Sequence, residues 1–169
     1  PAEFLAGSAL DPVTLRRSED SFVDELFAAA PQVGAPLLRA NFPRAYLDPN
    51  REPWELDPGM FDEPLPDHVN SDSQRVAGGL GTIPRVVSSG AEIYREKLPF
   101  AEAERRVNEL YKPFHATLTS LIDETHEEFG CAVLIDCHSM PAVGGPMDKD
   151  RGHERVEIVL GDRFGTSCA

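Results

Sequence analysis

The chain has 169 residues, 41% hydrophobic and 27% charged, which is the length and composition of one ordinary globular domain. Its formal net charge of −13 argues against nucleic acid as the main partner, because phosphate binding needs clustered lysines and arginines. A small anionic substrate is still compatible with this charge, since it needs only one or two well-placed arginines.

The sequence predicts neither a membrane segment nor a secretory signal. It has no run of about 18 apolar residues. Residues 1–15 do not show a basic region followed by an apolar core. The three cysteines, Cys131, Cys137 and Cys168, have the spacing of neither a metal-binding pair nor a disulfide framework. We therefore expect a reduced, cytoplasmic protein.

A first amphipathic helix is predicted over Ser21–Ala30, with Ser18 as its N-cap and Pro31 as its end. Asp20 lies in its first turn, and Asp24 lies one turn further on the same face. Acidic residues near a helix N-terminus interact favourably with the helix dipole, which is one explanation of the pair. A role as ligands is the other.

Two short strands are predicted next, over residues 35–42 and 44–48. They lead into a proline-flanked turn that carries Asn50 and Arg51. A single arginine in a loop is usually solvated surface. An Asn-Arg pair on a stiff turn is a better candidate for a binding site, because the planar guanidinium binds carboxylates through two hydrogen bonds.

Residues 54–81 are rich in proline, aspartate and glycine and predict an extended loop. Its glycines are not followed by a Lys-Ser/Thr pair or by the start of a helix, so a nucleotide-binding loop is excluded. A possible edge strand follows over residues 82–87, where Pro84 removes one backbone donor.

The longest helical pattern runs from Phe100 to Phe129, with apolar residues at steps of three and four. Pro113 should kink this helix or divide it in two, and Gly130 should end it. We expect His126, in an acidic turn, to be exposed. His115 could belong either to the core or to a site.

A short apolar run, Cys131–Ile135, predicts a strand that is buried on both faces. A second strand is predicted over residues 156–160, ending near Asp162 and Arg163. A helix followed by a buried strand is typical of a crossover unit in an α/β fold. In such folds the ligand crevice lies beyond the carboxyl ends of the strands, where Asp136 and His138 follow the first run.

A histidine directly after a buried strand, with an aspartate two residues earlier, suits a metal ligand and its orienting group. Zinc binds histidine and carboxylate ligands and keeps one position open for water at catalytic sites. It lowers the pKa of that water and polarises a carbonyl, which amide hydrolysis needs. Asp20 or Asp24 could supply further ligands to His138. A metal hydrolase is therefore one hypothesis, and an unspecified α/β domain is the other.

Two other catalytic schemes have less support. Cys137 lies beside His138, but neighbours on a strand point to opposite faces and would not form a nucleophile and base pair. Ser139 lacks the Gly-x-Ser-x-Gly turn of the α/β-hydrolases.

Six segments, in order along nearly the whole chain, resemble the N-formylglutamate amidohydrolase family. They are LRRSEDSFVDELF (15–27), FPRAYLDPNREPWELDP (42–58), RVAGGLGTIPRVV (75–87), YKPFHATL (111–118), LIDCHSMP (134–141) and GDRFGTSC (161–168). The resemblance implies a zinc-exopeptidase-like α/β fold, a three-layer sandwich with a mixed or parallel central sheet, related to carboxypeptidases and acylglutamate or acylaspartate deacylases. It implies hydrolysis of N-formyl-L-glutamate to formate and L-glutamate, a step of histidine degradation.

The resemblance also suggests roles for particular residues. By analogy, His138 would bind zinc, and Asp136 would join it in the catalytic site. Asp20 would be the carboxylate ligand, with Asp24 as the alternative.

Other residues would bind the substrate. Asn50 and Arg51 match the Asn-Arg pair that holds the substrate α-carboxylate in related exopeptidases. Arg44, Arg75 and Arg85 are candidates for the side-chain carboxylate.

Two family features are absent from the sequence: an early Ser-Pro-His-Ser-Gly-like motif, whose histidine is expected to bind zinc, and a late glutamate expected to be the general base. We therefore expect residues 1–169 to form a single domain that is the central part of the catalytic domain. Two alternatives remain. One is a non-catalytic α/β fragment that keeps a carboxylate-binding pocket at Arg51. The other is a related deacylase of another N-acyl amino acid.

Overall fold

The computed structural model describes residues 1–145 and 149–161, and the chain divides into two compact units. The first unit is Pro1–Cys137 and the second begins at His138. Asp162, Arg163 and Cys168 lie outside the described residues.

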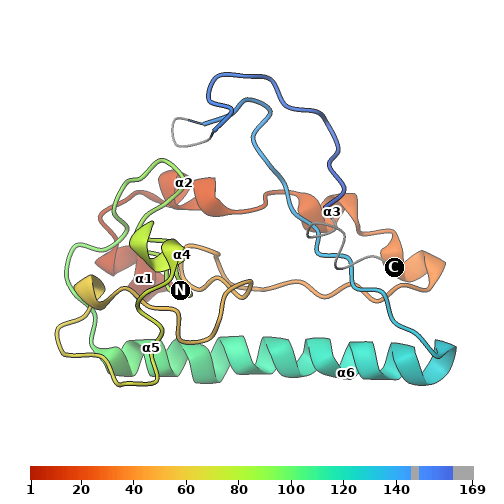
Figure 1. The fold of residues 1–169 in the computed structure, drawn as a ribbon, viewed down its shortest axis with the longest axis horizontal. Helices are drawn as coiled ribbons and strands as arrows, with labels where there is room; N and C mark the ends of the chain where they lie inside the picture. Colours follow the sequence, from red (N-terminus) through yellow and green to blue (C-terminus); the bar gives the residue numbers. More distant parts are fainter. Residues whose placement is uncertain (146–148, 162–169) are drawn as a thin grey trace. The chain divides into compact units, whose positions relative to one another are not determined.

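Helices and turns make up the regular structure of the first unit (Figure 1). The α-helices are α1 (Ala2–Gly7), α2 (Pro12–Leu15), α3 (Val23–Leu26), α4 (Gln74–Ala77), α5 (Phe100–Arg106) and α6 (Lys112–Phe129). The 3₁₀ turns are η1 (Arg16–Ser18), η2 (Ala30–Val33) and η3 (Pro58–Met60), and η4 (Val107–Tyr111) is a π-helical turn. Residues 54–81 are irregular apart from η3 and α4, as predicted. None of the helices in the described part of the chain has the length and apolar character to cross a bilayer.

The long helix predicted over 100–129 is confirmed, but Pro113 does not divide it, because the backbone stays helical from α5 through η4 into α6. Figure 1 shows α5 and α6 following one another in nearly the same direction. The π-helical turn η4 separates them and ends just before Pro113, which lies in the first turn of α6. Proline cannot donate a backbone hydrogen bond, so an irregular turn is expected beside it. Gly130 ends α6 with φ +72°, and His126 is exposed, both as predicted.

The predicted helix over Ser21–Ala30 is wrong in its extent. Only α3, with four residues, is α-helical, and Pro31 begins the next turn, η2, instead of ending a helix. Phe22 precedes α3 in the left-handed region, with φ +66°. Of the apolar residues in this stretch Val23 is buried, whereas Leu26 is 77% exposed. A helix that buries so little apolar surface gains little from tertiary packing, on which most helices depend.

The strand predictions at 35–42, 44–48, 82–87, 131–135 and 156–160 are wrong for the described residues, which contain no strand. Pairing there is limited to isolated bridges, such as Ser8 with Tyr94. A strand needs a neighbour to satisfy its backbone donors and acceptors. The apolar side chains of 131–135 and 156–160 are exposed, Val133 by 83% and Leu160 by 96%. Asp136 and His138 therefore do not follow a buried strand.

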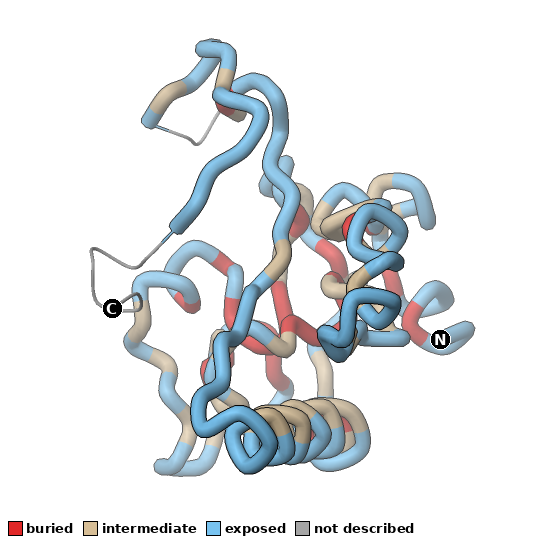
Figure 2. Tube along the Cα trace, turned by 90° about the vertical axis from the view of Figure 1, so that its right-hand side faces the viewer, coloured by how far each residue is buried: buried red, intermediate tan, exposed pale blue. Residues whose placement is uncertain are grey.

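The core lies in the first unit and has two parts. Figure 2 shows buried stretches in the first unit, while the described trace of the second is almost wholly exposed. One cluster contains Phe4, Leu15, Ala45, Tyr46, Val87 and Ile93. The other contains Leu56, Met60, Phe61, Ile83, Phe100 and Ala103. The turn that carries Asn50 and Arg51 therefore lies between two buried segments, 45–48 and 55–56.

Candidate carboxylate-binding site

The turn at residues 48–51 is anchored by a buried aspartate. The side chain of Asp48 is 6% exposed, and its backbone N–H donates to the carbonyl of Thr82 at 2.8 Å. Its Oδ1 accepts the backbone N–H of Asn50 at 3.0 Å, which closes a local turn of the kind that aspartate favours. Pro49 between them restricts φ. Asn50 and Arg51 thus project from a stiff turn, as predicted.

The carboxylate of Asp48 pairs with two predicted substrate-binding arginines. Its Oδ2 accepts the Nε–H of Arg44 at 3.0 Å and lies 3.4 Å from Nη2 of Arg51. Arg44 also donates from Nη1 to Oδ2 of Asp20 at 2.8 Å. The structure therefore brings Asp20, Arg44 and Arg51 together around one buried carboxylate.

The sequence predictions missed Asp48, although a signal for it was present. The buried run Ala45–Leu47 leads directly into Asp48. A carboxylate that follows such a run is itself close to the core, and a buried charge must be paired. Arginines at positions 44 and 51 were the available partners.

The guanidinium of Arg51 is held on three sides and keeps hydrogen-bonding capacity. Nε donates to the carbonyl of Leu80 at 3.1 Å and Nη1 donates to the carbonyl of Asn50 at 2.7 Å. Of its five N–H groups, these contacts and Asp48 leave one on each terminal nitrogen, which matches the two oxygens of a carboxylate. Burial lowers the pKa of Arg51, while the charge of Asp48 opposes this shift. An arginine remains charged at any physiological pH.

The π-helical turn η4 and the start of α6 support this turn from the other side. The hydroxyl of Tyr111 donates to the carbonyl of Arg51 at 2.6 Å. Nε2 of His115 lies 2.8 Å from the carbonyl of Pro49. A carbonyl oxygen only accepts, so Nε2 of His115 must carry the proton in this contact. The structure thus gives His115 a positioning role, which the sequence left undecided, and π-helical turns are frequent at such sites.

Asn50 also contacts a residue from the far end of the first unit. Its Nδ2 donates to Oδ2 of Asp136 at 3.0 Å, which directs the amide nitrogen toward the segment after α6. The structure therefore brings the predicted catalytic Asp136 to the predicted carboxylate-binding turn.

The remaining predicted arginines differ in their placement. Arg75 is 56% exposed and its Nη1 lies 3.7 Å from Oε2 of the buried Glu55. Its positive charge is one of the smaller influences that lower the pKa of Arg51. Arg85 is instead paired with Asp57 at 2.8 Å and Glu92 at 3.1 Å. The substrate-binding roles of Arg75 and Arg85 stay predictions.

Comparison with known proteins identifies the family. All residues from 1 to 169 match the family model for N-formylglutamate amidohydrolase. The chain belongs to the N-formylglutamate amidohydrolase family. The crystal structure of N-formylglutamate amidohydrolase from Ralstonia eutropha has a matching fold, with a TM-score of 0.85 and 37% sequence identity. The match covers 99% of this chain and 59% of that one.

Two curated relatives agree with this assignment. An N-formylglutamate deformylase of Pseudomonas putida is 29% identical over 124 residues, which cover 72% of this chain and 40% of the relative. One from Pseudomonas aeruginosa is 30% identical over 151 residues, covering 88% and 50%. The chain thus spans about half the length of the curated relatives that it matches.

The resemblance to the N-formylglutamate amidohydrolase family implies a zinc site with His138 and either Asp20 or Asp24 as ligands. Across 1–145 and 149–161, no group of three or more His, Cys, Asp or Glu side chains could hold a metal ion. Asp20 is paired with Arg44, and Asp24 with Arg39 at 2.6 Å. These carboxylates do not match a preformed zinc site.

His138, the other predicted zinc ligand, is exposed and begins the second unit. Its catalytic and metal-binding roles stay predictions, as does its joint role with Asp20 or Asp24. The catalytic role of Asp136 also stays a prediction.

Cys137, the residue before His138, does not have the lowered thiol pKa of an activated cysteine. Burial, and then the negative charge of Asp136, raise the pKa of Cys137. Nucleophilic cysteines in enzymes are instead found where the thiol pKa is lowered. A thiol mechanism is therefore disfavoured for this member of the N-formylglutamate amidohydrolase family.

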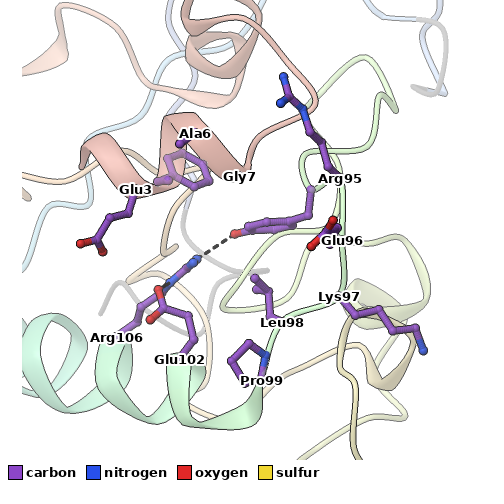
Figure 3. A pocket seen from close by; sticks show the side chains of 12 residues that line it. Glu3, Ala6, Gly7, Arg95, Glu96, Lys97, Leu98, Pro99, Glu102 and Arg106 are labelled. Atoms are coloured by element: carbon purple, nitrogen blue, oxygen red, sulfur yellow. Dashed lines mark hydrogen bonds and ion pairs between the residues drawn. The ribbon is translucent and has the colours of Figure 1, made fainter.

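A cavity of about 490 Å³ lies apart from the candidate site, between α1, residues 94–99 and the start of α5 (Figure 3). Three of its polar side chains, those of Arg106, Tyr94 and Glu102, contact one another. Arg106 donates to the hydroxyl of Tyr94 at 2.7 Å and to Glu102 at 2.8 Å. Burial raises the pKa of Tyr94. None of the predicted site residues is among those that line this cavity.

Proposed function

We propose that this chain is part of an enzyme that hydrolyses N-formyl-L-glutamate. In this reaction water adds to the formyl carbon and the C–N bond breaks, giving formate and L-glutamate. Support comes from the family match along the whole chain and from the relatives, which are N-formylglutamate deformylases and an N-formylglutamate amidohydrolase. The structural observation that carries the proposal is Arg51, held on a stiff turn with an N–H group available on each terminal nitrogen. The pathway would be histidine degradation, as the resemblance implies.

In this proposal Arg51 binds one carboxylate of the substrate through two parallel hydrogen bonds. Asn50, next to it, supplies a neighbouring polar group, and Arg44 and Arg75 are the candidates for the second carboxylate. A dianionic substrate in a protein of net charge −13 needs such a local group of arginines. Arg85 is a further candidate for that carboxylate and, like Arg44, it is paired with two acidic side chains, Asp57 and Glu92.

Zinc dependence and the three-layer α/β sandwich are further parts of the proposal, and both rest on the family resemblance. His138 and either Asp20 or Asp24 are the candidate ligands. Zinc content, measured per purified chain for the wild type and for His138→Ala, tests this part. About one zinc per chain in the wild type, lost in the variant, would support it. Equal zinc contents would contradict the role of His138.

Formate release tests the reaction itself. The wild-type chain is supplied with zinc and incubated with N-formyl-, N-acetyl- or N-succinyl-L-glutamate, and the free formate, acetate or succinate is measured. Release from the formyl substrate, reduced at least about tenfold in Arg51→Lys, is the expected result. Faster release from another substrate would instead indicate a deacylase of another N-acyl amino acid.

A second candidate function is a non-catalytic domain that binds carboxylates. It is favoured by the arginine partners of the two candidate carboxylate ligands, Arg44 for Asp20 and Arg39 for Asp24. Binding of N-formyl-L-glutamate at Arg51 without release of formate would support it over the first.

A further inference from the structure

We infer that Asp48 is the positioning residue of the carboxylate-binding site, which holds Arg51 and Arg44 in place for the substrate. This inference rests on the proposed function. It assigns Asp48 no contact with the substrate, only with the two arginines.

The carboxylate of Asp48 lies where it can fix both arginines. Oδ2 of Asp48 lies 3.0 Å from Nε of Arg44 and 3.4 Å from Nη2 of Arg51. Oδ1 of the same carboxylate accepts the backbone N–H of Asn50 at 3.0 Å. Two flexible arginine side chains are thereby fixed relative to the turn on which Asp48 lies. A site must hold its binding groups within about 0.5 Å of the productive geometry, and contacts of this kind achieve it.

The charge of Asp48 also keeps two positive side chains close together. Arg44 and Arg51 contact the same carboxylate oxygen, so their charges lie close together and repel one another. The side chain of Asp48 is 6% exposed, so its negative charge is poorly screened by water and offsets that repulsion. An asparagine side chain in its place would keep the volume but present N–H donors or a neutral oxygen to two cations. Arg51 would then be free to turn away from the substrate.

Asp48 also helps to fix the orientation of the Arg51 guanidinium, which would face the substrate. Leu80 and Asn50 accept hydrogen bonds from Nε and Nη1 of Arg51, and Oδ2 of Asp48 lies 3.4 Å from Nη2, so each nitrogen of the guanidinium has a partner that fixes the orientation of its plane. Removing Asp48 releases Nη2, which is one of the two nitrogens that a bidentate carboxylate needs. The effect should therefore fall on substrate binding, and on kcat only slightly.

The test compares Asp48→Asn with a matched control, Glu19→Gln. Asp48→Asn removes the charge of the carboxylate that accepts the Nε–H of Arg44. Glu19→Gln does the same to the acceptor of the Nε–H of the exposed Arg16. Calorimetric titration with N-formyl-L-glutamate should show binding weakened at least about tenfold by Asp48→Asn and unchanged by Glu19→Gln. Equal affinities of wild type and Asp48→Asn would overturn the inference.

A double-variant cycle separates positioning from a general loss of structure. In the Arg51→Gln background, adding Asp48→Asn should weaken binding less than about threefold, because its main target is gone. A further tenfold loss in that background would overturn the inference. The Arg51→Gln single variant keeps Asp48, so its affinity can be measured even if the Asp48→Asn variant does not fold.

Hydrogen exchange of the arginine side chains reads the position of Arg44 without any ligand. The Nε–H of Arg44 should exchange at least about tenfold faster in Asp48→Asn, while that of Arg16 changes only in Glu19→Gln. No change at Arg44 would overturn the inference. If the wild type fails to bind N-formyl-L-glutamate, the proposed function fails, and the Arg44 exchange rate still decides whether Asp48 holds the arginines.

Discussion

The side-chain amide of Asn50 donates a hydrogen bond of 3.0 Å to the carboxylate of Asp136, across 86 positions of the sequence. Asn50 lies on the turn between the buried segments 45–48 and 55–56, and Asp136 follows α6. The sequence predicted them separately, as a substrate-binding and a catalytic residue. Their contact within the first unit joins the end of the long helix segment to the carboxylate-binding turn.

Removing this contact should weaken substrate binding modestly. In Asp136→Ala the amide of Asn50 loses the partner that directs it, at a cost of about 0.5–1.5 kcal/mol for one hydrogen bond. We expect the dissociation constant for N-formyl-L-glutamate to rise about two- to tenfold by calorimetry. Glu124→Ala, which removes an exposed hydrogen bond to Ser120 on α6, is the control and should bind as the wild type does. Full affinity in Asp136→Ala would show that the contact does not serve the site.

Leu56 is a central residue of the second core cluster and is fully buried. Leu56→Ala should lower the free energy of unfolding by about 2–5 kcal/mol, because it leaves a cavity among aromatic and aliphatic side chains. The same substitution at Leu26, which is 77% exposed, should change it by less than about 0.5 kcal/mol. Urea denaturation of both variants measures the difference. Similar costs would mean that this cluster is not a core of the folded chain.

Gly81 lies where the chain passes close to the backbone of Glu55. A Cβ at this position would collide with the Glu55 carbonyl oxygen, although φ is not in the left-handed region. Gly81→Ala should therefore destabilise the chain by about 1–3 kcal/mol, as overpacking does. Gly7→Ala is the control, since a Cβ there meets no atom within 4 Å. Equal thermal midpoints of the two variants would contradict the close approach.

In the second unit, Arg155 forms two hydrogen bonds to Asp150, at 2.6 and 2.7 Å. They lower the pKa of Asp150 from 3.8 to about 2. A lowered pKa means that the folded state favours the carboxylate, so this pair is fully formed above the ordinary pKa. Its contribution disappears as the pH falls through about 2.

An NMR titration of the Asp150 carboxyl carbon measures this shift. We expect a midpoint near 2 in the wild type and a midpoint close to the ordinary value in Arg155→Gln. A wild-type midpoint near 3.8 would mean that the pair does not form in solution.

Features that depend on local chemistry could be predicted from the sequence. The apolar spacing from Phe100 to Phe129 predicted the long helix, and Pro113 indicated where its regular hydrogen bonding is interrupted by the π-helical turn η4, because proline lacks a backbone donor. Gly130 ends α6 for an equally local reason, since glycine adopts positive φ without strain. The Asn50–Arg51 turn follows from the prolines that flank it.

Features that depend on a partner elsewhere in the chain could not be predicted. The apolar run at 131–135 has strand composition, but composition does not supply the neighbouring strand that its backbone needs. The helix predicted at Ser21–Ala30 failed similarly, because Leu26 and Phe27 find no core. Asp48 differs from these cases: the apolar run before it and the arginines at 44 and 51 were a local signal, but only the folded chain shows that both arginines contact its carboxylate.

The central claim is that Arg51 binds a carboxylate of N-formyl-L-glutamate, and calorimetric titration of the wild type and Arg51→Lys tests it most directly. Lysine keeps the charge but loses the planar pair of N–H groups. We predict measurable binding in the wild type, weakened at least about tenfold in Arg51→Lys and unchanged in Arg16→Lys, an exposed control. Equal affinity of the wild type and Arg51→Lys would contradict the claim.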